Sequence, residues 1–92
     1  MAMEFEKINS IQKAIENYEE AVLLNFEGSY PYKRLAIIYR RNKDYKNEIR
    51  ILEHAIKVFT YLSYHSERGD ILSKLKGFND RLVKAEKYSL SH

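Results

Sequence analysis

The apolar residues of this 92-residue chain recur at alternating spacings of three and four along most of its length. That period matches the 3.6 residues of a helical turn, so each run predicts a helix with one apolar face. Glycine and proline, which interrupt helices, occur only three times and once. The sequence therefore predicts an all-α protein with four helices, over about residues 4–25, 30–42, 44–61 and 66–88.

Each predicted helix carries an apolar stripe that would contribute to one core. Ser29 and Asp44 are placed to cap the second and third helices, and Pro31 falls in the first turn of the second, where its missing N–H costs no hydrogen bond. Gly28 would help to end the first helix. The stripe positions, from the first helix to the fourth, are Ile8, Ile11, Ile15, Tyr18 and Val22; Leu35, Ile38 and Tyr39; Tyr45, Ile49, Leu52, Ile56 and Phe59; and Ile71, Leu75, Phe78, Leu82 and Ala85.

The fourth predicted helix carries two further signals. Ser66 is placed to cap it, and Gly77 lies in its interior. Because a glycine inside a helix costs about 1 kcal/mol relative to alanine, Gly77 predicts a position where another helix comes close.

Length and composition narrow the class of protein. A chain of 92 residues predicts one small domain over residues 1–92, and its 13% aromatic content is typical of a folded chain. The absence of cysteine leaves no disulfide framework and no thiolate metal site, which fits a cytoplasmic location. No apolar run reaches the roughly 20 residues of a membrane span, and the acidic, amphipathic N-terminal residues predict no signal peptide.

Residues 29–59 resemble a tetratricopeptide repeat, a helix–turn–helix unit of 34 residues. In that family an early aromatic residue, a Leu-Gly pair and a tyrosine mark the first helix, while a large apolar and a small residue mark the second. The residues of this chain that match the pattern, including its turn, are Tyr32, Leu35, Ala36, Tyr39, Asp44, Tyr45, Leu52 and Ala55.

The resemblance extends to about one and a half repeats over residues 11–59, because Ala14, Tyr18 and Ala21 match the second helix of a preceding unit. Glu48 departs from the pattern, which has a small residue there. The resemblance implies antiparallel helical hairpins closed by a C-terminal capping helix. Since one repeat cannot bury its faces alone, a second copy of the chain could complete the stack.

The second predicted helix carries the candidate binding face. Tetratricopeptide repeats expose their ligand-facing side there, and a basic face around one apolar contact suits an acidic or amphipathic peptide. The resemblance thus implies a non-enzymatic protein–protein interaction module, or adaptor. Reversal of Arg40 and Arg41 to Glu is expected to abolish binding with little effect on stability. The residues of the candidate face are Lys33, Arg34, Ile37, Arg40 and Arg41.

Three other interpretations of the sequence stay open. The basic face could simply be solvated, because charged helix faces are common. The chain could form a homodimeric structural module. Cations could also follow the phosphates of a nucleic acid, although interspersed acids and a net charge of +3 argue against nucleic acid as the main partner. The cations in question are Arg40, Arg41, Lys43, Lys46 and Arg50.

The sequence predicts no enzyme activity, metal or cofactor. His54, His65 and His92 lack metal-ligand spacing, and no nucleophile–base pair or phosphate-binding glycine loop can be found. The tyrosines are expected to pack with their hydroxyls near the rim rather than to form a stacking platform. The tyrosines concerned are Tyr30, Tyr32, Tyr39, Tyr45, Tyr61 and Tyr64.

Overall fold

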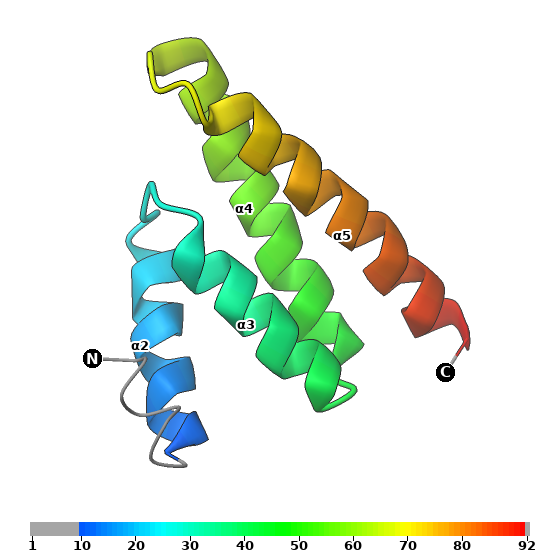
Figure 1. The fold of residues 1–92 in the computed structure, drawn as a ribbon. Helices are drawn as coiled ribbons and strands as arrows, with labels where there is room; N and C mark the ends of the chain where they lie inside the picture. The colour runs from blue at the N-terminus through cyan, green and yellow to red at the C-terminus, as the bar shows by residue number, and fades with distance from the viewer. Residues whose placement is uncertain (1–9, 92) are drawn as a thin grey trace.

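The computed structural model describes residues 10–91 and contains four α-helices, with no strand among the described residues (Figure 1). This confirms the all-α class. Residues 4–9 of the first predicted helix, with the stripe position Ile8, lie outside the described residues. No helix in residues 10–91 combines the length and the apolar character needed to cross a membrane. The helices are α2 (Ile11–Leu23), α3 (Tyr30–Arg41), α4 (Tyr45–His65) and α5 (Ile71–Ser91).

The boundary between α4 and α5 differs from the prediction. α4 continues to His65, and α5 begins at Ile71 rather than near Ser66. Ser66 instead ends α4, because its backbone is extended and its N–H donates to the carbonyl of Leu62 at 2.8 Å. Leu62 is buried, so the last turn of α4 is held by packing and the tyrosine-rich segment stays helical.

α2 and α3 end in the same way, with a left-handed residue that is not glycine. Asn25 has φ 53° and Lys43 has φ 59°. In each case the next N–H reaches back to a carbonyl five residues earlier, from Phe26 to Ala21 at 3.0 Å and from Asp44 to Tyr39 at 2.8 Å. This is the Schellman arrangement, which satisfies the last carbonyls of a helix. Asn25 therefore ends α2, and the expectation for Gly28 was wrong.

The starts of α3 and α4 largely follow the prediction. Pro31 lies in the first turn of α3, whereas Ser29 makes no side-chain capping hydrogen bond within the described chain. Asp44 caps α4, because its carboxylate accepts a hydrogen bond from the backbone N–H of Asn47 at 3.3 Å. A tight turn of Asn42, Lys43 and Asp44 thus joins α3 to α4.

α4 is the central helix of the fold. It packs against both α3 and α5, and it lies between them in Figure 1, while its contact with α2 is smaller. α4 therefore has buried residues on more than one of its sides. Leu52 and Phe59 are buried as predicted, and Ile51 and Ala55 are fully buried on the wider face.

An aromatic cluster ties α3, α4 and α5 together. The rings of Tyr32, Phe59 and Phe78 have centroids 5.3–6.3 Å apart in edge-to-face pairs. The Tyr32 hydroxyl donates a hydrogen bond to the carbonyl of Phe26 at 2.6 Å. Burial, with a smaller contribution from the nearby charge of Glu27, raises the pKa of Tyr32 to about 12. The apolar stripe predicted for the fourth helix is confirmed, because Phe78 lies in this core.

Polar side chains fasten α2 to the hairpin of α3 and α4. Glu19 of α2 accepts hydrogen bonds from the Tyr39 hydroxyl and, at 2.5 Å, from Arg50. Burial, together with the Glu19 carboxylate, raises the pKa of Tyr39 above its ordinary value. On the same helix, Tyr18 and Val22 are buried in the core, as the stripe of the first helix predicted.

Candidate binding face

The solvent side of α3 carries three of the five predicted site residues. Lys33, Ile37 and Arg41 follow one another at intervals of four, which places them on one helical face. Lys33 and Arg41 are exposed and Ile37 is partly buried. Among residues 10–91 neither cation makes an ion pair, and α3 itself contains no acidic residue. The described chain thus brings two unpaired cations together around one apolar side chain.

Arg34 is in a different situation. It is partly buried and already interacts with other groups of the protein. It is therefore less accessible to a partner than Lys33 or Arg41.

Arg40 is held by α4 and α5. Its Nε donates to Oε2 of Glu48 at 2.7 Å, and its guanidinium carbon lies 5.2 Å from the ring centroid of Tyr88. Its Nη2 also lies 3.5 Å from the carbonyl oxygen of Arg81. Reversal of Arg40 would break these contacts, so the expectation that its reversal leaves stability unchanged does not hold.

Arg40 supplies the counter-charge for Glu48, a buried carboxylate of α4. The side chain of Glu48 is 0% exposed, and its Oε1 has no hydrogen-bond partner among the described residues. Burial raises the pKa of Glu48, and the charges of Arg40 and Arg81 oppose that rise. The departure from the repeat pattern at residue 48 is thus accommodated by an ion pair that the pattern does not contain.

A second basic stripe runs along α5 and was missed by the sequence analysis. Lys74, Gly77, Arg81 and Lys84 follow the three-four spacing, and no acidic residue of α5 interrupts them. Arg40 links this flank of α5 to α3 through its contacts near Arg81. The spacing was readable in the sequence, but the proximity to α3 depends on how α5 packs.

We call the side chains of these two stripes together the basic face. One carboxylate, Asp70, precedes the α5 stripe, and Arg68 neutralises it at 3.1 Å. The Arg68 partner holds the pKa of Asp70 below its usual range, so this carboxylate stays charged and paired. The basic face comprises Lys33, Ile37 and Arg41 of α3 with Lys74, Arg81 and Lys84 of α5.

Gly77 lies in the middle of the α5 stripe and has open space around it. A Cβ atom added at this position would meet no described atom within 4 Å. The close helix contact predicted for Gly77 is therefore wrong. Nothing within the described chain requires a glycine there.

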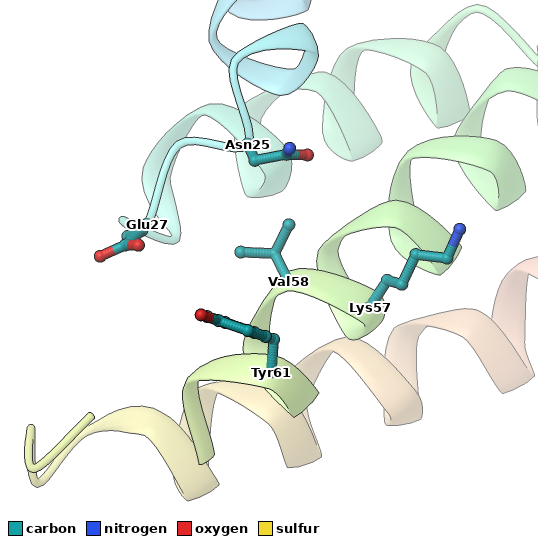
Figure 2. A pocket seen from close by; sticks show the side chains of 5 residues that line it. All are labelled: Asn25, Glu27, Lys57, Val58 and Tyr61. Carbon is teal, nitrogen blue, oxygen red and sulfur yellow. The ribbon is translucent and has the colours of Figure 1, made fainter. Parts of the chain in front are cut away.

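A shallow hollow of about 300 Å³ lies between the segment that follows α2 and the outer side of α4 (Figure 2). It contains none of the predicted site residues. Its lining offers one carboxylate, one ammonium group and a phenol, but no nucleophile paired with a base. The lining residues are Asn25, Glu27, Lys57, Val58 and Tyr61.

The tyrosines divide into two groups. Tyr32 and Tyr39 are buried, which confirms their packing role, and Tyr45 stacks on Tyr88 with centroids 6.1 Å apart. Tyr30 packs edge-to-face on Tyr18 with centroids 6.1 Å apart, and Tyr61, although exposed, stacks on His65 with centroids 4.1 Å apart. Tyr64 is 82% exposed, so the packing role predicted for it was wrong.

Histidine and carboxylate side chains form no metal cluster in the part of the chain that the structure describes, where no group of three or more could hold an ion. His54 instead makes a 2.8 Å hydrogen bond to Oδ1 of Asn25. His92 lies outside the described residues.

No protein-family model, curated protein or solved structure matches the chain. The resemblance to tetratricopeptide repeats therefore stays a prediction that rests on the residues quoted above.

Proposed function

We propose that this chain is a non-enzymatic protein–protein interaction module of tetratricopeptide-like architecture, which binds an acidic or amphipathic peptide segment on the basic face. The observation that carries the proposal is the pair of cationic stripes on α3 and α5, which meet near Arg40. Lys33, Arg41, Lys74 and Lys84 of these stripes are exposed. A segment with several carboxylates would supply counter-charges to Lys33 and Arg41, which make no ion pair within residues 10–91.

The side chains of the basic face have distinct roles in this proposal. Lys33 and Arg41 donate charge-assisted hydrogen bonds to carboxylates, and Ile37 between them contacts an apolar side chain of the peptide. Because Arg40 neutralises Glu48, the buried carboxylate does not repel an acidic ligand. The open position at Gly77 lets the peptide approach the backbone of α5 closely.

The repeat-like architecture has separate support. Ala36 of α3 and Ala55 of α4, which occupy positions that the family keeps small, are both 0% exposed, and the two helices pack on each other. Tyr32 and Leu52, at the large positions of the pattern, are also fully buried. The burial of these four residues supports the tetratricopeptide-like part of the proposal.

The test is a fluorescence anisotropy titration with a labelled amphipathic peptide of Glu and Leu. The variant Lys33→Glu/Arg41→Glu should weaken binding by at least about tenfold, since each lost charge contact is worth roughly 1 kcal/mol. Its helicity and melting should stay close to those of the wild type, because both side chains are exposed and make no ion pair within residues 10–91. The matched control is Lys57→Glu/Lys87→Glu, which changes the net charge equally at exposed positions outside the basic face.

Equal loss of binding in both double variants would show a response to net charge alone and would contradict the assignment of the basic face. A single-stranded oligonucleotide is titrated in parallel. If it binds more tightly than the peptide, with an affinity that falls steeply with salt, the partner is nucleic acid and the proposal fails.

A further inference from the structure

A stripe of exposed residues runs along the flank of α5 opposite to the basic face. Its six positions alternate spacings of four and three from residue 72 to residue 90, a rise of about 27 Å at 1.5 Å per residue. Three of the six side chains are apolar, and they are 71%, 53% and 90% exposed at positions 72, 83 and 90. The other three positions are also exposed. We call this set the outer stripe: Leu72, Lys76, Asn79, Val83, Glu86 and Leu90.

The outer stripe does not serve the core of the chain. The core positions of α5 are Ile71, Phe78 and Ala85, which are buried on a different face of the helix. A repeated three-four spacing with exposed Leu and Val at its ends and centre is the pattern of a coiled-coil seam. The fold leaves this seam without a partner in the part of the chain that the structure describes.

The order of residues in the outer stripe points to the partner. Residue 81 is the midpoint of three pairs of stripe positions. These pairs are Leu72 with Leu90, Lys76 with Glu86, and Asn79 with Val83. In an antiparallel pair of identical helices, positions equally distant from the centre face each other. We propose that a second copy of this chain docks on the outer stripe, with its α5 antiparallel to the first.

This arrangement gives every position of the seam a facing residue. Leu72 packs on Leu90 of the second copy at both ends, and Lys76 faces Glu86 of the second copy twice by symmetry. Asn79 meets Val83 of the second copy on either side of the two-fold axis. Asp80 flanks the axis and lies 3.1 Å from Nζ of Lys76, whose three N–H donors can contact Asp80 and Glu86 of the second copy together.

The opposite orientation is disfavoured by charge. In a parallel pair each residue faces its own copy, so Lys76 would face Lys76 and Glu86 would face Glu86. Like charges in register destabilise a seam, whereas the antiparallel pair turns both layers into salt bridges. The outer stripe thus specifies its orientation as well as its partner.

Sedimentation equilibrium over protein concentrations from about 5 to 500 µM tests the proposal, because a monomer–dimer equilibrium depends on concentration. The wild type should pass from monomer to dimer. Lys76→Glu and Glu86→Lys should each weaken association by at least about tenfold, because each places like charges in two layers. An equimolar mixture of the two variants should form a heterodimer, since each layer then pairs a carboxylate of one variant with an ammonium group of the other. That rescue shows that both variants are folded.

The control is Lys84→Glu, a charge reversal on α5 within the basic face. It should leave association unchanged and weaken binding of the acidic peptide, while Lys76→Glu should do the reverse. Failure of the dimer and failure of the peptide site are therefore distinguishable.

Cysteine cross-linking measures the relative orientation of the two α5 helices. No native cysteine interferes, because the chain has none. Leu72→Cys mixed with Leu90→Cys should form the mixed disulfide in preference to either homodimer. A wild type that stays monomeric at the highest concentration overturns the proposal. Undiminished association of Lys76→Glu, or preferential self-cross-linking of Leu72→Cys, overturns the assigned stripe or its direction.

Discussion

Truncation of Arg40 is the most informative change for the stability of this fold. The variant Arg40→Ala would leave Glu48 buried with no hydrogen-bond partner in the described chain for either carboxylate oxygen, and with Arg81 as the remaining nearby positive charge. Removal of one partner from a buried ion pair costs about 3–5 kcal/mol. The side chain of Arg40 is 29% exposed, so we expect the lower end, about 3 kcal/mol.

A second route gives the same magnitude. The stranded carboxylate can avoid its charge by binding a proton. Neutralising at pH 7 a group whose ordinary pKa is 4.5 costs roughly 3.4 kcal/mol, at 1.36 kcal/mol per unit. This limits the penalty, because protonation becomes easier than keeping the charge buried. A loss of about 3 kcal/mol lowers the melting temperature of a domain this size by about 12–24 °C.

The cost should depend on pH in a defined direction. The folded-state pKa of Glu48 is raised, so the folded protein binds more protons than the unfolded chain between the two pKa values. The stabilisation of the fold by this extra proton is fully present below the pKa that Glu48 has in the unfolded chain. It is lost as pH rises through the pKa that Glu48 has in the folded protein. Without Arg40 the pKa rises further, so the difference between Arg40→Ala and the wild type should shrink from pH 7 to pH 4.5.

The assay is urea unfolding followed by far-UV circular dichroism at both pH values. The control is Arg40→Ala in a Glu48→Ala background, where no buried charge remains at this position and the loss should fall to below about 1 kcal/mol. An equal loss in both backgrounds, or an equal loss at both pH values, would refute the reasoning.

Two further predictions concern single backbone positions, each measured by thermal and urea unfolding. Lys43→Gly should stabilise the fold by about 1 kcal/mol, because Lys43 has φ 59° and a side chain is strained in that region; an unchanged or lower midpoint would contradict this. Gly77→Ala should also add about 1 kcal/mol, because the new methyl group meets no described atom within 4 Å, and destabilisation would mean that α5 packs more tightly there.

The apolar stripes could be read from the sequence because helix formation and burial share one period. Tyr18, Leu35 and Phe78 lie in the core for that reason. The two-sided burial of α4 could not be read, since a periodic pattern identifies one face, whereas α4 packs against α3 and α5 at once. The ends of the helices were harder still, because Asn25 and Lys43 adopt conformations that favour glycine.

The candidate site also has one part that local spacing predicts and one part that depends on helix packing. The exposure of Lys33 and Arg41 follows from helical spacing alone, so local pattern was sufficient. The role of Arg40 depends on Glu48 and Tyr88, which lie 8 and 48 positions further along the chain and meet it only through helix packing. The departure of Glu48 from the repeat pattern was the one signal in the sequence that Arg40 would be engaged.

The helices of this chain pack almost entirely against their neighbours in sequence, with α4 contacting α3 on one side and α5 on the other. Such a topology has low contact order, because few loops must close before buried contacts form. Folding can therefore begin at the hairpin of α3 and α4 and extend toward either end. The same property lets α2, whose contacts with α3 and α4 are the least extensive, open while the other three helices stay packed, so the surfaces proposed for recognition on α3 and α5 lie on the part of the fold that holds together.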